Sequence, residues 1–230
     1  MAGKRYRSDL EKATSDPVPL IEAVNRVKAM KKLKFDQTVN LVVHLGIDPK
    51  QADQQLRGAI SLPNGIGGDP KRVIAFVAAE KEDAAKEAGA IKAGSEELVK
   101  EIEGGWQAFD VAIAEPAMMR VVARLGKVLG PRGLMPSPKA GTVTPNVAQA
   151  VKEFVAGKVE YRNDDGGNIH VVIGRQSFEP GQLAQNAQAM IDHLTARKPA
   201  SSKGVYFKKA TIAGTMTPGV AVQINAGSAD

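Results

Sequence analysis

The sequence predicts a two-domain protein of mixed α+β and α/β class, with a discontinuous α+β sandwich from both termini and an inserted Rossmann-like parallel α/β domain. Three observations predict this fold class. Strands and helices alternate in the middle of the chain, amphipathic helices and strands fill both ends, and the excess positive charge lies at the ends. We place the joints at glycines, which gives a basic terminal domain of residues 1–66 and 157–230 and an inserted domain of residues 67–156.

The net charge is unevenly distributed between these two domains. The chain of 230 residues carries 31 Lys and Arg side chains against 25 Asp and Glu side chains. Residues 67–156 hold 12 basic and 12 acidic side chains, so the net charge of +6 belongs to the terminal segments. A basic domain suggests an anionic partner. The alternative is two sequential domains with a chance imbalance of charge.

Hydrophobic periodicity predicts the elements of the terminal domain. Apolar side chains at helical spacing predict amphipathic helices over residues 19–33 and around residues 183–194. The first carries basic residues on its other side, for which a solvated face is the simpler interpretation. Partly alternating apolar residues predict strands at 39–45, 158–162, 169–173, 205–211 and 219–224. Asp164-Asp165-Gly166-Gly167 predicts a hairpin turn between the second and third of these strands.

The inserted domain is predicted from strand and helix alternation. Residues 72–78 form a continuous apolar strand, as expected in a sheet covered on both faces. There follow a helix at 80–88, a short strand at 90–92, a helix opening at Ser95, a strand at 109–114 and a helix at 117–129. Ser95 is expected to cap its helix, and Thr144-Pro145 to open the last helix with Thr as N-cap.

Several classes of function are excluded or disfavoured by composition. The chain has no cysteine, which excludes disulfides, thiolate catalysis and cysteine metal sites. Its longest apolar run, residues 73–79, is far below the roughly 20 residues that span a bilayer, and no apolar segment follows the basic N-terminus as in a signal peptide. We therefore expect no membrane association and a cytoplasmic protein.

Catalytic signatures are also missing. The three histidines, His44, His170 and His193, lack metal-binding spacing, and Gly65-x-Gly67 precedes a strand where a dinucleotide-binding loop would follow one. We expect no enzyme activity, no catalytic residue, no metal and no cofactor. The rival hypothesis is a nucleotide- or sugar-phosphate-binding enzyme that uses residues 67–156.

One segment of the inserted domain is strongly basic. Residues 116–152 contain no acidic residue, and glycine and proline make the stretch from Leu125 to Thr144 a rigid irregular loop. A structural cap on the sheet is the alternative role for this loop. We predict a secondary basic edge that consists of Arg120, Arg124, Lys127, Arg132 and Lys139.

The same loop carries a family resemblance. The stretch Leu125-Gly-Lys-Val-Leu-Gly-Pro-Arg-Gly-Leu-Met-Pro-Ser-Pro-Lys139, followed by Gly141-Thr-Val-Thr144, resembles the signature of the first-numbered large-subunit ribosomal protein family, in its bacterial form. Further matches occur in the family's order over almost the whole chain. They are Lys34-Phe-Asp-Gln-Thr-Val39, Arg57-Gly-Ala-Ile-Ser-Leu-Pro-Asn-Gly-Ile-Gly67, Tyr161-Arg-Asn-Asp164, Ile169-His-Val-Val-Ile-Gly174 and Lys203-Gly-Val-Tyr206.

The resemblance implies a non-enzymatic protein of the large ribosomal subunit, a monomer when free, whose terminal domain binds large-subunit (23S) rRNA directly. It also implies a two-strand hinge, a role in the mobile stalk that releases exit-site tRNA, and repression of its own operon mRNA through the same surface. A free-standing RNA regulator outside the ribosome is a further alternative. The implied RNA-binding residues are Lys34, Phe35, Thr38, Arg162, Asp164, His170, Thr215, Met216 and Thr217.

The physical chemistry of these residue types suits RNA. Lys34 and Arg162 can neutralise phosphates, and Asp164 can accept from a base or a 2′-hydroxyl. Thr215 and the backbone around Met216 can read 2′-hydroxyls. The alternative place for Phe35 is the hydrophobic core.

One position departs from the family pattern. The family usually has Thr-Met-Gly-Pro where this chain has Thr215-Met216-Thr217-Pro218. If that glycine adopts a positive φ, Thr217 would be strained by roughly 1–3 kcal/mol. Gly219 follows at once and could absorb the turn.

Overall fold

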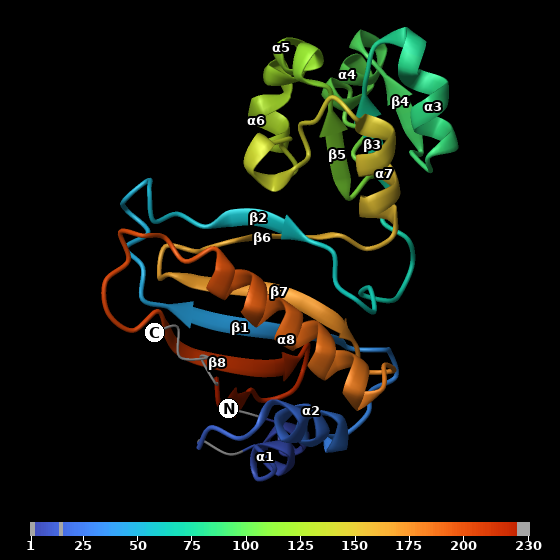
Figure 1. The fold of residues 1–230 in the computed structure, drawn as a ribbon. Helices are drawn as coiled ribbons and strands as arrows, with labels where there is room; N and C mark the ends of the chain where they lie inside the picture. The colour runs from blue at the N-terminus through green and yellow to red at the C-terminus, as the bar shows by residue number, and fades with distance from the viewer. Residues whose placement is uncertain (1–2, 14–15, 225–230) are drawn as a thin grey trace. The chain divides into compact units, whose positions relative to one another are not determined.

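The computed structural model of the chain describes residues 3–13 and 16–224 and divides into two compact units. The terminal unit combines Met1–Gly68 with Val159–Asp230, and the inserted unit is Asp69–Lys158 (Figure 1). Each boundary lies two residues after the glycine joint expected from the sequence. The predicted fold class, a discontinuous α+β unit with an inserted parallel α/β unit, is confirmed.

An antiparallel sheet forms the body of the terminal unit. Its strand order is β7-β1-β8-β9, with the central strand β1 paired to β7 and β8. Thr38 at the start of β1 lies opposite Arg175, and His44 near its end lies opposite Asn168. The strands are β1 (Thr38–Leu45), β7 (Asn168–Arg175), β8 (Phe207–Gly214) and β9 (Val220–Val222).

The core of the terminal unit lies between this sheet and two helices. Val39, Leu41, Val43 and Leu45 alternate along β1 and are buried against α2 (Leu20–Ala29) and α8 (Pro180–Ala196), as a strand with one covered face requires. Figure 1 shows α8 lying across the sheet. The residues that alternate with the buried ones in β1 are half-buried, so the opposite face of the sheet is partly open.

A two-stranded ribbon completes the terminal unit with the short helix α1 (Lys4–Leu10). The antiparallel ribbon pairs β2 (Arg57–Ile60) with β6 (Val159–Arg162), and periodicity alone predicts only β6. Tyr161 of β6 is buried in the core, and its hydroxyl oxygen lies 3.0 Å from Nε2 of His193 on α8. The ribbon is thereby attached to the helical side of the unit.

The inserted unit contains a parallel sheet with strand order β4-β3-β5. Ile74 and Phe76 of β3 pack in one cluster with Leu98 and Leu125, whereas α7 contacts β3 and β5 without joining that cluster. Since neighbouring strand residues point to opposite faces, both faces are covered. Its elements are β3 (Val73–Phe76), η1 (Ala79–Lys81), α3 (Glu82–Glu87), β4 (Lys92–Gly94), α4 (Glu96–Glu103), β5 (Val111–Ala114), η2 (Pro116–Met118), α5 (Met119–Val122), η3 (Ala123–Leu125), α6 (Gly126–Leu129), η4 (Pro138–Ala140) and α7 (Val147–Val155).

Two helix predictions were wrong in detail. The helix expected over 19–33 ends at Ala29, because Met30 is extended and the Lys31 N–H donates to the Asp9 carboxylate at 3.1 Å. The helix expected over 117–129 is a series of short α and 3₁₀ turns, although Val122, Leu125 and Leu129 still share a buried side.

The expected caps were also wrong. Ser95 holds the N-cap position of α4, but its side chain makes no capping hydrogen bond. The last helix of the inserted unit begins at Val147 with Asn146 as N-cap, two residues after the predicted start at Pro145. The Thr144 hydroxyl accepts from the Asn146 N–H at 3.2 Å, so it stabilises the turn before the helix.

Candidate RNA-binding surface

The nine residues that the sequence implicates in RNA binding all lie in the terminal unit, and none is buried. They form two groups at opposite ends of β1. The strand-start group lies near Thr38 and contains Lys34, Phe35, Thr38, Thr215, Met216 and Thr217. The strand-end group lies near His44 and contains Arg162, Asp164 and His170.

The turn between β8 and β9 connects most of the strand-start group. The Thr215 N–H donates to the Thr38 carbonyl at 3.0 Å, and the Met216 N–H donates to Oε1 of Gln37 at 3.0 Å. Arg5 donates to the Met216 carbonyl at 3.0 Å. Backbone groups around Met216, expected to read 2′-hydroxyls, therefore already have partners in the protein. The side chain of Met216, 51% exposed, is the part that this turn presents.

Thr217 takes its place in this turn without backbone strain. No non-glycine residue in the described part of the chain has a positive φ, so the strain considered for Thr217 does not arise. Its hydroxyl accepts from the Gly214 N–H at 2.8 Å, and its N–H donates to the Gly214 carbonyl at 3.2 Å. Gly219 does not have a positive φ either. A Cβ at Gly219 would come within 2.6 Å of Thr211, so this glycine is needed for close packing.

Phe35 lies on the surface. Its side chain is 52% exposed, so the alternative of a core position is wrong. The neighbouring Asp36 holds this segment to the end of β7, because its carboxylate accepts from the Ser177 N–H at 3.0 Å and the Ser177 hydroxyl at 2.7 Å. Lys34 and Phe35 are thereby held on a segment tied to the sheet.

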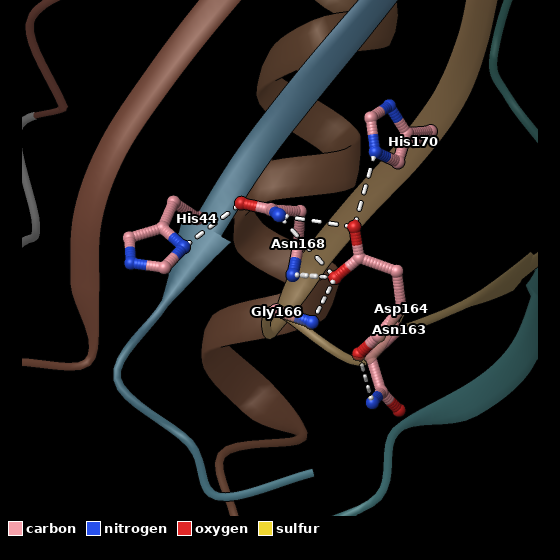
Figure 2. A network of polar contacts seen from close by, with 6 residues as sticks. All are labelled: His44, Asn163, Asp164, Gly166, Asn168 and His170. Carbon is pink, nitrogen blue, oxygen red and sulfur yellow. Dashed lines mark hydrogen bonds and ion pairs between the residues drawn. The ribbon is translucent and has the colours of Figure 1, made fainter.

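The strand-end group is built on the predicted Asp164–Gly167 turn, which is confirmed (Figure 2). The Asp164 carboxylate accepts from the backbone N–H of Gly166 at 2.9 Å and of Asn168 at 2.7 Å, and from the Asn168 side-chain amide at 3.0 Å. Hydrogen bonds from the Asn168 side chain and backbone, and then from Gly166, lower the pKa of Asp164. Asp164 thus holds the turn and has little acceptor capacity left for RNA.

The same network extends to two histidines. Asn168 donates its amide to Asp164, so its Oδ1 is the acceptor for Nδ1 of His44 at 2.8 Å, and Nδ1 of His44 carries a hydrogen. Nε2 of His170 lies 3.6 Å from the Asp164 carboxylate, and the His170 side chain is 61% exposed. Figure 2 shows the chain of contacts from His44 through Asn168 and Asp164 to His170.

Further polar residues of the open sheet face are half-buried or exposed and lie at the strand-end group or between the two groups, and no sequence motif indicates them. From Thr38 to His44 the strand extends about 20 Å at roughly 3.4 Å per residue. Alternation along the strands was the available signal, since the outward positions follow every buried one. These residues are Asn40, His44, Asn168, Lys209 and Thr211.

The secondary basic edge lies in the inserted unit, away from both groups in sequence. Arg120, Arg124 and Lys127 recur at helical spacing through α5, η3 and α6, while Lys139 lies in η4. All five of its members, including Arg132, are exposed, and none has an ion-pair partner among the described residues. This edge is a second surface on which positive charge is free to meet an anion.

Residues 3–13 and 16–224 include no group of three or more His, Asp or Glu side chains placed to hold a metal ion. Over the same residues, no helix combines the length and apolar character needed to cross a membrane.

Known proteins resemble this chain over most of its length. The model of the Ribosomal protein L1p/L10e family matches residues 27–218. A protein named large ribosomal subunit protein uL1 from Nocardioides sp. is 49% identical over 96% of this chain and 92% of its own. Proteins of the same name from Kosmotoga olearia, 50% identical over 86% of each chain, and Methylobacillus flagellatus, 52% identical over 89% of this chain and 88% of its own, also match.

Proposed function

The chain belongs to the ribosomal protein L1p/L10e family, and we propose that it is a constituent of the large ribosomal subunit that binds large-subunit rRNA directly through its terminal unit. In this proposal the terminal and inserted units are the two domains expected from the sequence, and the protein works on cytoplasmic ribosomes. The observation that carries the proposal is that all nine implicated residues lie on one unit, seven of them exposed and Thr38 and Thr217 half-buried.

Charge supports the terminal unit as the primary binding module. The inserted unit, residues 69–158, holds 13 basic and 12 acidic residues, which leaves +5 of the total net charge of +6 on the terminal unit. Lys34 and Arg162 are exposed near opposite ends of β1. A folded RNA that contacts both groups would release counterions at several phosphates, which gives affinity that falls with salt.

The composition of the surface favours recognition of shape and of 2′-hydroxyls. Aromatic residues make up 4% of the chain, so extensive base stacking along a single strand is not supported. The open sheet face between the groups offers the amide of Asn40 and the hydroxyl of Thr211. Such groups suit the shallow groove and 2′-hydroxyls of a structured RNA.

The proposal includes two further roles. The secondary basic edge would contact exit-site tRNA as the stalk moves, since its five cations have no ion-pair partner in the described part of the chain. The chain would also repress translation of its own operon, because an mRNA that imitates the rRNA fold would compete for the same terminal surface. Repression therefore needs no second RNA-binding site on the protein.

A salt titration of RNA binding tests the primary proposal. The affinity of the intact chain for a large-subunit rRNA stalk fragment is measured in excess unrelated RNA, and compared with Arg162→Ala and Lys139→Ala. We expect specific binding whose affinity falls with salt and is weakened only by Arg162→Ala, with a reduced salt slope for that variant. Binding that ignores RNA sequence, or that only Lys139→Ala abolishes, would contradict the assignment to the terminal unit.

A further inference from the structure

A hollow of about 310 Å³ opens beside the exposed ring of Phe35. Its wall is formed by the segment before β1 and by Gln176 and Ser177 after β7, and its size is within the range of about 300 to 1,000 Å³ typical of ligand pockets. Lys32 and Lys34 line it and are exposed. The hollow thus combines an aromatic face with two cations.

Beneath this surface, two buried glutamines form a hydrogen-bonded pair. Gln37 is 1% exposed and Gln176 is 7% exposed. The Met216 N–H donates to Oε1 of Gln37 at 3.0 Å, which fixes the orientation of the Gln37 amide. Nε2 of Gln37 then donates to Oε1 of Gln176 at 3.0 Å.

This order leaves one donor without an acceptor. Because Oε1 of Gln176 receives the bond from Gln37, the remaining group of that amide is Nε2, which carries two hydrogens. Among the described residues, it is the buried side-chain nitrogen or oxygen atom that has no hydrogen-bond partner. Exchanging the nitrogen and oxygen of Gln176 would place two donors against each other, so the atom without a partner is the donor Nε2.

We propose that this hollow is a nucleotide subsite of the RNA surface, in which one unpaired nucleotide places an oxygen acceptor against Nε2 of Gln176. The base lies against Phe35, and the phosphates on either side lie near Lys32 and Lys34. The acceptor is a base carbonyl or a ribose hydroxyl. The inference rests on the proposed function, since it specifies how that same surface meets RNA.

In the free protein Nε2 of Gln176 has no hydrogen-bond partner among the described residues, so a bond from this atom to RNA would stabilise the complex. A buried donor that lacks a partner is costly. A nucleotide that brings an acceptor to it as the rim side chains move aside removes that cost. A site built to donate discriminates strongly against a ligand that lacks the acceptor.

The substitution Gln176→Glu tests the donor directly. A glutamate keeps an oxygen to accept from Gln37 but presents a second acceptor where the amide donor was. The matched control is Gln223→Glu, which adds the same charge to an exposed residue beyond β9, at the opposite edge of the sheet. For the rRNA stalk fragment, we expect Gln176→Glu to weaken binding about tenfold relative to this control, which corresponds to about 1.4 kcal/mol.

A nucleotide scan identifies the occupant. Single abasic and single 2′-deoxy substitutions are placed along the fragment and measured with the wild-type chain, Gln176→Glu and Phe35→Ala. We expect one unpaired position whose substitution weakens wild-type binding several-fold and has little further effect in either variant. An effect of the abasic change alone assigns the acceptor to the base, and an effect of the 2′-deoxy change assigns it to the ribose.

Equal affinity of Gln176→Glu and Gln223→Glu, at equal thermal stability, would overturn the subsite. If Gln176→Glu does not fold, Phe35→Ala decides, because an exposed side chain can be removed without loss of the fold. If the loss of affinity caused by Phe35→Ala simply adds to the loss caused by every RNA substitution, the proposed subsite would be overturned. Failure of the wild-type chain itself to bind the fragment would instead overturn the proposed function.

Discussion

Asn186 is a fully buried polar residue of α8 that ties the segment after β2 to the core. Its Oδ1 accepts from the Asn64 N–H at 3.0 Å. Its Nδ2 donates to the carbonyls of Gly65 and Ile173, each at 2.8 Å. We predict that Asn186→Leu, a change of similar size without polar atoms, strongly destabilises the terminal unit.

The magnitude follows from the surroundings of the three bonds. The bond to Ile173 is buried, so its carbonyl left unpaired costs about 1–3 kcal/mol, and the two partly buried bonds contribute about 0.5–1.5 kcal/mol each. The apolar leucine side chain returns about 1.5–3 kcal/mol through its burial. The free energy of unfolding should therefore fall by about 2 kcal/mol.

Urea unfolding followed by far-UV circular dichroism measures this loss as a lower midpoint. Trp106, the single tryptophan, lies in the inserted unit, so its fluorescence reports that unit separately. The matched control is Gln185→Leu, the preceding residue, which bonds the same Asn64 from an exposed position at 3.0 Å and should change stability by less than about 0.5 kcal/mol. A loss below about 1 kcal/mol for Asn186→Leu would refute the reasoning.

Two further predictions concern Thr217 and His193. Thr217→Val removes the hydroxyl that accepts from the Gly214 N–H, so we expect a loss of about 1 kcal/mol in urea unfolding and weaker rRNA binding, whereas Thr211→Val should leave stability nearly unchanged. Burial, and then the Arg197 charge, lowers the pKa of His193, so the unfolded chain binds its proton more readily. The stability that neutral His193 contributes should be fully present above the ordinary pKa of 6.5 and should be lost as the pH falls below it. His193→Gln should flatten this part of the curve of unfolding free energy against pH. An unchanged slope in that variant would contradict the assignment to His193.

Strand periodicity in the sequence was sufficient to predict the strands that form the body of the terminal unit. The strand predicted at 39–45 is β1, because alternating Val and Leu side chains face a core on one side only. β2 escaped prediction because it is four residues long and includes Gly58. A Cβ at Gly58 would come within 2.7 Å of the Tyr161 hydroxyl, a constraint set by a residue distant in sequence.

The limits of helix prediction have the same origin. Apolar spacing alone extends the first amphipathic helix to residue 33, but the Lys31 backbone bonds to Asp9, which is 22 positions earlier. No local pattern shows such a contact. A tertiary contact, and not helix propensity, therefore determines where α2 ends.

Only part of the candidate site could be predicted from the sequence. Residue types that suit RNA could be identified from sequence motifs, and their exposure agrees with that interpretation. The internal bonds of Asp164 and of the Met216 backbone could not be predicted, because they depend on turn geometry and on Gln37. The pair Gln37 and Gln176 is separated by 139 positions, so its unpaired donor appears only in the folded chain.

The most direct test of the central claim is sedimentation with large ribosomal subunits that lack this protein. The purified chain is mixed with such subunits at high salt and compared with Arg162→Ala. The account predicts that the chain sediments with the subunit at one copy each and that Arg162→Ala is released at lower salt. A wild-type chain that stays at the top of the gradient would contradict a role as a constituent of the subunit.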